Sequence, residues 1–452
     1  MIDGSWMDDF GTWQANAEWP GGMKAAAEKI RAAGLEPGIW TCPFVVMAES
    51  LILEKYPDLV ARDAAGEPCL FGYQGPTCYG VDVTAPSAPA YFNDLYGRLR
   101  DWGYRYHKLD FLRAIITAEN IVFHDRSLNR AQAYQRGMRL IREAAGADAY
   151  ILACGGLFEG SAAWADAVRT SSDTVGDWQR QGYAEDRPAC EVTAKQNLLR
   201  NYTARFWHVD PDALMLRLRN EPFGSAWPHF SRGTLTDDEA FTLLTVQYLC
   251  GGAACIGERF RELPERRRAL LRHLIPQVAD PAVALDWLHP GCPSVYLTRL
   301  NAPGSGLQPW YTLAVINWEN ALHERTVELP PLGGDARRWA GFEFCEQRFA
   351  GIFECGDPLK MTLPAHGTRV FRFAPWDGCN PVILGTDLHL SGGACELRNI
   401  RVSDRDIHGS VESRWRDFPV KVTAAFPCGD DDIRVKSGTV RPGELFRLSS
   451  DG

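Results

Sequence analysis

Short apolar runs alternate with amphipathic helical stretches over the first 285 residues, and this alternation limits the fold more than any other sequence feature. Apolar residues at helical spacing predict helices at residues 22–33, 90–102, 130–144, 239–249 and 265–274. The runs between them predict strands at residues 1–3, 35–40, 104–110, 149–154, 167–173, 205–210 and 253–256. Strands that alternate with helices over this length predict a parallel sheet, and the best fit is an α/β fold of the (β/α)8 TIM-barrel type.

The number of predicted strands is one short of a closed barrel. Seven runs are visible, and the chain opens directly on one of them. A barrel without one of its strands has an unpaired edge and an open core. We therefore expect a barrel that lacks its first strand, which an upstream segment or a partner would supply.

After about residue 290 the helical pattern gives way to short alternating runs. These predict strands at residues 294–300, 311–317, 325–329 and 368–373, with Gly and Pro between them. They indicate an antiparallel β-sandwich packed against the barrel. The expected domains are a catalytic barrel at residues 1–285, a C-terminal β-sandwich at 286–376 and a further β-rich segment at 377–452.

Composition and charge argue against several classes of protein. Hydrophobic residues make up 45% of the chain and charged residues 23%, as in a globular protein with a sizeable core. The net charge is −9 without any Lys/Arg-rich block, so nucleic acid is not expected as a partner. No apolar run approaches the roughly 20 residues that cross a bilayer, so no membrane contact is expected either. The first residues lack the pattern of a signal peptide, which favours a cytoplasmic location.

The cysteines do not form a recognisable metal-binding pattern. Thirteen are scattered along the chain without CxxC pairs or a histidine at zinc-ligand spacing. They are typical of buried small side chains in a reducing compartment. We therefore expect neither a metal nor a cofactor, whereas the sequence leaves homo-oligomerisation open.

Polar or reactive residues stand at the carboxyl ends of the predicted strands. Barrel enzymes build their active sites at this face, and six or seven such residues in register are more specific than one. The residues are Asp3, Trp40, Lys108, Asp110, Cys154, Asp173 and Asp210. This pattern predicts an active site that binds a small molecule or an oligosaccharide.

Two of these residues fit the chemistry of glycoside hydrolysis. Cleavage with retention needs two carboxyl groups roughly 5–5.5 Å apart, one that attacks the anomeric carbon and one that protonates the leaving oxygen. Asp110 and Asp173 end different strands, as this mechanism requires in a barrel. Lys108 lies two residues before Asp110 and shares its face of the strand, and Arg169 could hold a second sugar hydroxyl. The residues alone leave open that each Asp is a turn residue or a helix cap.

An ordered set of motifs resembles a known family. Tyr106-His107-Lys108-Leu109-Asp110 resembles the K-W-D nucleophile motif of melibiase-type α-galactosidases, glycoside hydrolase family 36, which shares a clan with families 27 and 31. Residues 2–6 are similar to that family's D-D-G-W segment, 19–23 to its F-P-x-G-M helix start, 34–43 to its G-x-x-x-G-L-W-x-x-P strand, 154–156 to its C-S-G-G-G loop, 172–173 to its acid/base S-D and 210–217 to its N-D-P-D-x-L-x-L-R signature. The motifs cover residues 1–285 in the family's order.

The resemblance implies a retaining exo-α-glycosidase, α-galactosidase-like, that cleaves terminal α-linked sugars of oligosaccharides or glycoconjugates. Asp110 would be the nucleophile and Asp173 the acid/base. The sugar-binding pocket would be lined by Asp3, Trp40, Lys108, Cys154 and Arg169. Independently of the resemblance, aromatic rings suit the apolar face of a sugar, and Trp6, Trp13, Trp40 and Trp178 fall near predicted strand ends.

Three departures from the family pattern bear on the sugar. Gly4 replaces the second Asp of D-D-G-W, Cys42 replaces the Glu of W-F-E-P, and Leu112 replaces the Asn of K-W-D-x-N. A site that binds particular hydroxyls discriminates through those partners, so these changes should alter the preferred sugar. Two alternatives to hydrolysis stay open: a transglycosidase of the raffinose-synthase type and a catalytically inactive carbohydrate-binding relative.

Overall fold

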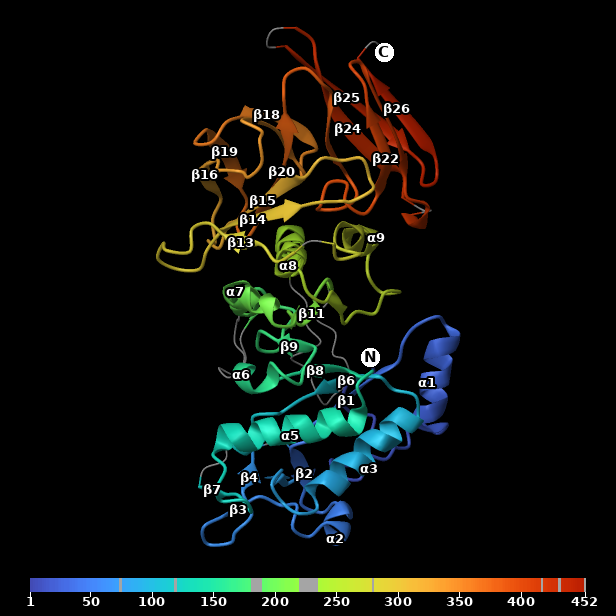
Figure 1. Cartoon of the computed structure of the whole chain (residues 1–452), viewed down its shortest axis with the longest axis vertical. Helices are drawn as coiled ribbons and strands as arrows, with labels where there is room; N and C mark the ends of the chain where they lie inside the picture. Colours follow the sequence, from blue (N-terminus) through green and yellow to red (C-terminus); the bar gives the residue numbers. More distant parts are fainter. Residues whose placement is uncertain are drawn as a thin grey trace. The chain divides into compact units, whose positions relative to one another are not determined.

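The computed structural model describes residues 1–72, 75–117, 120–179, 189–218, 235–278, 280–415, 418–429 and 432–450 (Figure 1). Contacts divide the chain into two compact units. The first contains Met1–Arg169 and Phe206–Asp210, and the second contains Thr170–Arg205 and Pro211–Gly452. Each unit is described below by itself.

A parallel sheet forms the centre of the first unit. Its order is β1 (Gly38–Thr41), β6 (Tyr106–Leu109), β8 (Tyr150–Ala153), β9 (Ala167–Arg169) and β10 (His208–Asp210). Every neighbouring pair is parallel. Ile2 adds a parallel bridge to Ile39, so the start of the chain lies along β1. The predicted parallel α/β sheet is therefore confirmed, with strands shorter than the apolar runs suggested.

Two long helices carry much of the apolar surface that packs on this sheet. They are α3 (Ala88–Asp101) and α5 (Arg130–Ala145), which pack on each other. Asn129 and Gln132 form a reciprocal capping box at the start of α5, which satisfies backbone N–H groups that the helix leaves unpaired. The remaining helices of this unit are α1 (Gly22–Ala32), α2 (Ile52–Lys55), α4 (Ala114–Thr117) and α6 (Phe158–Ser161).

The first unit also contains small antiparallel sheets. The sequence did not predict them. The strands β2 (Val45–Met47), β5 (Cys78–Gly80) and β4 (Leu70–Phe71) form one sheet, and β3 (Arg62–Asp63) pairs with β7 (Ile121–Val122). The first sheet belongs to the long connection that leaves the carboxyl end of β1 and leads to α3. In a parallel α/β fold, connections at this end of the strands surround the functional site.

Helices and a short parallel pair begin the second unit. The elements are α7 (Cys190–Arg200), η1 (Asn201–Arg205), α8 (Asp237–Cys250), α9 (Glu265–Arg268) and η3 (Ala269–His273), with β11 (Ala213–Leu214) parallel to β12 (Cys255–Ile256). Helix α7 was missed by the sequence reasoning. The predicted helix at residues 265–274 is wrong in type after Arg268, where the chain tightens into a 3-10 helix ahead of Pro276. A proline disfavours helical geometry in the residue before it.

Antiparallel sheets make up the remainder of the second unit, as the sequence predicted. One sheet has the order β13 (Val283–Ala284), β14 (Val295–Leu300), β15 (Trp310–Ile316), β20 (Thr368–Trp376), β17 (Arg338–Glu343) and β18 (Arg348–Phe353). The pair β16 (His323–Glu328) and β19 (Pro358–Leu363) joins it around a shared apolar core. All four predicted strands of this region correspond to strands of the structure.

The β-rich C-terminal segment has a core of its own. One sheet contains β21 (Val382–Thr386), β24 (Val420–Pro427) and β25 (Ile433–Val440), and the other contains β22 (Leu397–Val402), β23 (Asp406–Val411) and β26 (Leu445–Ser449). Fourteen buried side chains, including Leu397, Val422 and Phe426, form one apolar cluster between these strands. Across the described residues, no helix combines the length and apolar character that a bilayer crossing needs.

Candidate active site

Asp110 directly follows β6, and its carboxylate is held by two N–H donors. The Trp40 indole Nε1 donates to Asp110 Oδ2 over 3.0 Å, and the Phe111 backbone N–H donates to Asp110 Oδ1 over 2.7 Å. The Asp110 backbone N–H donates to the Thr41 carbonyl at the end of β1. Phe111 has φ +50, a conformation that a bulky side chain rarely adopts. The backbone therefore bends sharply at the point where the carboxylate is presented.

Lys108 and Asp3 form an ion pair beside Asp110. Lys108 Nζ donates to Asp3 Oδ2 over 2.8 Å; the lysine side chain is 10% exposed and the aspartate 57%. Burial lowers the pKa of Lys108, but the Asp3 carboxylate more than offsets this, so that the pKa is raised. Desolvation raises the pKa of Asp3, and the Lys108 charge outweighs it, so that the pKa is lowered. Both groups are therefore charged at neutral pH.

Arg169 and Asp210 form a second, fully buried pair at the ends of neighbouring strands. Arg169 Nε donates to Asp210 Oδ2 over 3.0 Å, and both side chains are 4% exposed. The two residues are register partners in the parallel pairing of β9 with β10. The Arg169 charge also acts on Lys108 and Asp3. Asp210 was named from its strand end, but its pairing with Arg169 was not predicted.

Cys154 lies at the end of β8 and is followed by two glycines with separate structural requirements. The Cys154 thiol is buried, and its backbone N–H donates to the Leu109 carbonyl. Gly155 has φ +67, which favours glycine. A Cβ at Gly156 would collide with the Tyr134 hydroxyl. Backbone geometry and packing thus account for this glycine pair.

The predicted aromatic residues lie in a buried cluster behind Asp110. Trp6 is fully buried, and its Nε1 donates to the Trp40 carbonyl over 2.8 Å. Trp40 is 5% exposed and contacts Phe10, Trp13 and Phe111 through its ring. Neither Trp6 nor Trp40 presents an open ring face to solvent. The role that aromatic composition suggested, stacking on a sugar, therefore does not follow from their positions.

Asp173 lies in the second unit, exposed, on the segment that follows β9. Helix α7 supports this segment: Ser172 N–H donates to Gln196 Oε1, and Thr170 Oγ1 donates to Asn197 Oδ1. On the other side of Asp173, Thr174 N–H donates to Asp212 Oδ2 over 2.7 Å. The seven other predicted site residues all lie in the first unit.

No protein-family model matches the chain. The structure is similar to that of an α-galactosidase from Thermus thermophilus in complex with p-nitrophenyl α-D-galactopyranoside, with 28% identity, 66% of this chain and 57% of that chain covered, and a TM-score of 0.54. The same enzyme is matched in complex with stachyose at 30% identity, over 60% of this chain and 57% of that chain, with a TM-score of 0.51. The resemblance to the α-galactosidases is confirmed.

More distant neighbours share the fold over more of the chain. A GH27 β-L-arabinopyranosidase from Geobacillus stearothermophilus matches at 14% identity, over 82% of this chain and 82% of that chain, with a TM-score of 0.59. An α-galactosidase from Mortierella vinacea matches at 13% identity, over 82% and 86%, with a TM-score of 0.53. These neighbours are glycoside hydrolases. The chain spans 57% of the length of the Thermus enzyme that it matches.

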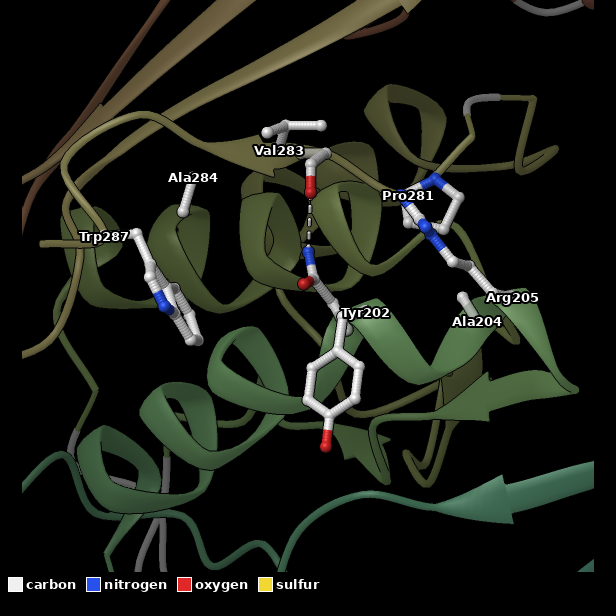
Figure 2. Close-up of a pocket in the computed structure, with 9 residues that line it drawn as sticks. Tyr202, Ala204, Arg205, Pro281, Val283, Ala284 and Trp287 are labelled. Atoms are coloured by element: carbon white, nitrogen blue, oxygen red, sulfur yellow. Dashed lines mark hydrogen bonds between the residues drawn. The ribbon is translucent and has the colours of Figure 1, made fainter.

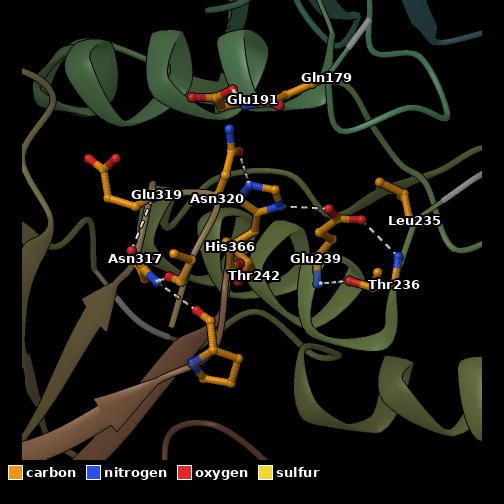
Figure 3. A network of polar contacts seen from close by, with 12 residues as sticks. Gln179, Glu191, Leu235, Thr236, Glu239, Thr242, Asn317, Glu319, Asn320 and His366 are labelled. Carbon is orange, nitrogen blue, oxygen red and sulfur yellow. Dashed lines mark hydrogen bonds and ion pairs between the residues drawn. The ribbon is translucent and has the colours of Figure 1, made fainter. Parts of the chain in front are cut away.

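A polar network in the second unit joins the start of α8 to a turn before β20 (Figure 3). His366 Nδ1 lies 2.7 Å from Glu239 Oε1, and His366 Nε2 lies 2.7 Å from Asn320 Oδ1. The Glu239 carboxylate also accepts the Thr236 N–H as part of the α8 capping box. Trp178 is buried and stacks on His366 with ring centroids 4.9 Å apart. These contacts give Trp178 a packing role.

A hollow on the second unit contains none of the predicted site residues. It has a volume of about 380 Å³ and is lined by two segments, residues 201–205 and 281–287 (Figure 2). The Asn201 side chain ties them together by donating to the Ala282 carbonyl over 2.8 Å. Tyr202 and Trp287 line the hollow with partly exposed rings, and its surface is mostly apolar.

Three buried residues near the start of β22 have metal-ligand side chains: the donor atoms of His389, Cys395 and Glu396 lie within 4.8 Å of one another. The Glu396 carboxylate already accepts hydrogen bonds from Thr386 Oγ1 and from the Cys395 N–H and Sγ. Arg372 lies close enough to Glu396 for their charges to interact. Hydrogen bonding accounts for the Glu396 carboxylate without an ion, and the expectation of no metal stays a prediction.

Proposed function

We propose that this chain is a retaining exo-α-glycosidase of the α-galactosidase type, with Asp110 as nucleophile and Asp173 as acid/base. The observation that carries the proposal is the position of Asp110. Its carboxylate stands at the carboxyl end of a central parallel strand, oriented by two N–H donors and beside the Lys108–Asp3 pair. The similarity to a Thermus α-galactosidase supports the same reading.

The proposal includes the architecture that this chemistry uses. Residues 1–285 form a (β/α)8-type catalytic barrel, residues 286–376 a β-sandwich and residues 377–452 a further β-rich segment. Support comes from the parallel pairing of β1, β6, β8, β9 and β10 and of β11 with β12. In a barrel, residues at the carboxyl ends of different strands face one substrate. The proposal therefore assigns Asp110 and Asp173 to the same glycosidic bond.

The reaction proceeds in two displacements. Asp110 attacks the anomeric carbon while Asp173 donates a proton to the leaving oxygen, through a transition state with oxocarbenium character. A covalent glycosyl ester on Asp110 and a free leaving alcohol result. Asp173, now ionised, takes a proton from water, and the water oxygen attacks the same carbon, which releases Asp110. Two inversions restore the original anomeric configuration.

Charged groups beside Asp110 would bind the sugar. Lys108 has two further N–H bonds besides the one it donates to Asp3, and the half-exposed Asp3 carboxylate can accept from hydroxyls. The charge of Arg169 also favours an ionised Asp3. Gly4 and Cys42 offer fewer polar groups than the family pattern. We therefore expect the Lys108–Asp3 pair to determine the selectivity for one sugar, because the full set of galactose contacts is not present.

A panel of p-nitrophenyl glycosides tests the proposal. We expect release of p-nitrophenol from one α-glycoside, with the α-galactoside as first candidate, and the first-formed free sugar in the α configuration by NMR. A parallel reaction with an added sugar acceptor distinguishes hydrolysis from transglycosylation, because only the latter yields a new oligosaccharide. No turnover of any α-glycoside by folded protein that binds galactose would support an inactive carbohydrate-binding relative instead.

A further inference from the structure

Trp40 stands between an aromatic cluster and the proposed nucleophile. One side of its indole belongs to the core, where ring centroids of Phe10 and Trp13 lie 5.8 Å and 6.4 Å away. Phe111 contacts it edge-on at 6.2 Å. The Trp40 side chain is 5% exposed, so these neighbours fix its orientation. A ring so enclosed offers almost no face to a ligand.

The polar edge of the Trp40 indole has a defined partner. Its single N–H donates to Asp110 Oδ2 over 3.0 Å, and the Phe111 N–H occupies Oδ1. Each oxygen of the carboxylate thus accepts one N–H, which fixes the plane of the group about the Cβ–Cγ bond. A preoriented nucleophile avoids the loss of rotational freedom that attack would otherwise require. A hydrogen bond to a charged acceptor is also among the stronger ones in proteins.

Resting on the proposed function, we infer that Trp40 is a positioning residue: its indole N–H holds the Asp110 carboxylate in the orientation from which it attacks the anomeric carbon. Trp40 acts through Asp110 and makes no stacking contact with the sugar. This role differs from the stacking that an aromatic residue near a strand end suggested. The backbone of Trp40 is anchored in turn, because Trp6 Nε1 donates to its carbonyl.

The matched control lies in the same cluster. Trp13 is fully buried, packs against Trp40, and donates its indole N–H to the Tyr91 hydroxyl over 3.1 Å, away from Asp110. Trp13→Phe and Trp40→Phe therefore remove the same atoms from one aromatic cluster and differ in the group that loses a donor. Thermal melting of both variants reports the loss of packing, which should be similar.

The experiment measures kcat and KM of both variants with the p-nitrophenyl α-glycoside that the wild type cleaves. We expect Trp40→Phe to lower kcat by about 10- to 100-fold with KM changed by less than about threefold, because the lost bond orients a reacting group. Trp13→Phe keeps an aromatic ring against Trp40 and leaves the N–H to Asp110 in place, so kcat should fall far less than in Trp40→Phe. If Trp40→Phe does not fold, β-(3-benzothienyl)alanine at position 40 replaces the N–H by sulfur in a ring of nearly the same shape, and the same loss of kcat is expected.

Two outcomes overturn the inference. Wild-type kcat in a variant without the N–H shows that Asp110 needs no such donor. A rise in KM at constant kcat shows that Trp40 contacts the sugar. Neither outcome touches the proposed function, since both require an active wild type. If the wild-type protein cleaves no glycoside, the proposed function is wrong, and the inference that rests on it is wrong as well.

Discussion

Lys108 Nζ lies 2.8 Å from Asp3 Oδ2, which joins the first residues of the chain to the strand that ends at the proposed nucleophile. The lysine is nearly buried and the aspartate is more than half exposed. The pair therefore combines a buried positive charge on Lys108 with a solvent-exposed negative charge on Asp3. It links two residues that are 105 positions apart in the sequence.

The Lys108–Asp3 pair should matter for activity far more than for stability. We expect Lys108→Met to lower kcat/KM by about 100-fold, because a charged hydrogen-bond donor to substrate is lost. The free energy of unfolding at pH 7 should fall by about 1 kcal/mol or less, since an exposed Asp3 carboxylate remains hydrated. Arg105→Met is the control: it removes an ion pair to Asp148 on the same unit, at the opposite end of β6, and should leave kcat/KM unchanged. Equal losses of activity in both variants would contradict a substrate-binding role for Lys108.

Asp173→Ala should separate substrates by their leaving groups. An alkyl or sugar leaving group needs a proton, so kcat/KM for a natural α-glycoside should fall by about 100- to 10,000-fold. For p-nitrophenyl or dinitrophenyl glycosides the leaving oxygen departs as a stable anion, and the loss in kcat/KM should be much smaller. The comparison of the two substrates is the measurement. A uniform loss across leaving groups would show that Asp173 is not the acid.

His107 should make the protein less stable in mild acid. Burial holds the pKa of His107 near 4, below its usual 6.5, and neither ring nitrogen has a hydrogen-bond partner among the described residues. The unfolded chain then binds more protons than the folded one between pH 6.5 and pH 4. The stabilising contribution is complete above pH 6.5 and declines as pH falls through this window, by about 2 kcal/mol at pH 5.

His107→Phe tests this directly. The phenyl ring can keep the edge-on contact with Tyr96 that the imidazole makes, and it cannot be protonated. Urea unfolding at pH 7 and pH 5 should show a smaller loss of free energy in the variant than in the wild type. His289→Gln, at an exposed position, should behave as the wild type. An unchanged pH dependence in His107→Phe would assign the acid sensitivity to other groups, among them His273, whose pKa burial also lowers to about 4.

Phe111 should reveal backbone strain next to the nucleophile. Its φ of +50 is accessible to glycine at little cost and unfavourable for residues with a Cβ. Phe111→Gly and Phe111→Ala both lose the ring contacts with Trp40 and Phe71. Only the glycine variant relieves the strain, so its free energy of unfolding should exceed that of the alanine variant by about 1 kcal/mol. An alanine variant as stable as the glycine variant would show that this conformation carries no strain.

The spacing of apolar residues predicted those helices and strands whose buried positions follow a regular pattern. The strands at residues 38–41, 106–109 and 150–153 are almost entirely buried, and α3 and α5 show a regular apolar stripe. Helix α7 was missed because its apolar residues are few and interrupted by polar ones such as Thr193 and Asn197, both buried in the structure. Its supporting contacts to the segment around Asp173 are long-range and leave no local pattern.

The sequence predicted residues and roles for the candidate site, but not the contacts that these residues make. Strand ends named Asp3, Lys108 and Asp110, and the structure brings them together in one unit. The resemblance placed Trp40 in the lining of the sugar pocket, and an aromatic residue at a strand end gives no sign of which neighbours will cover it. The backbone N–H of Phe111 could not be foreseen either, since it depends on a φ angle that a phenylalanine seldom adopts.

The measurement that tests the central claim most directly is identification of the residue that carries the glycosyl group. The protein is incubated with a fluorinated α-galactosyl substrate whose glycosyl ester forms faster than it hydrolyses, and proteolytic peptides are analysed by mass spectrometry. We predict the mass of one fluorogalactosyl group on Asp110, and no labelling of the Asp110→Ala variant. Label on another residue, or turnover by Asp110→Ala at the wild-type rate, would contradict the assignment of Asp110 as the nucleophile.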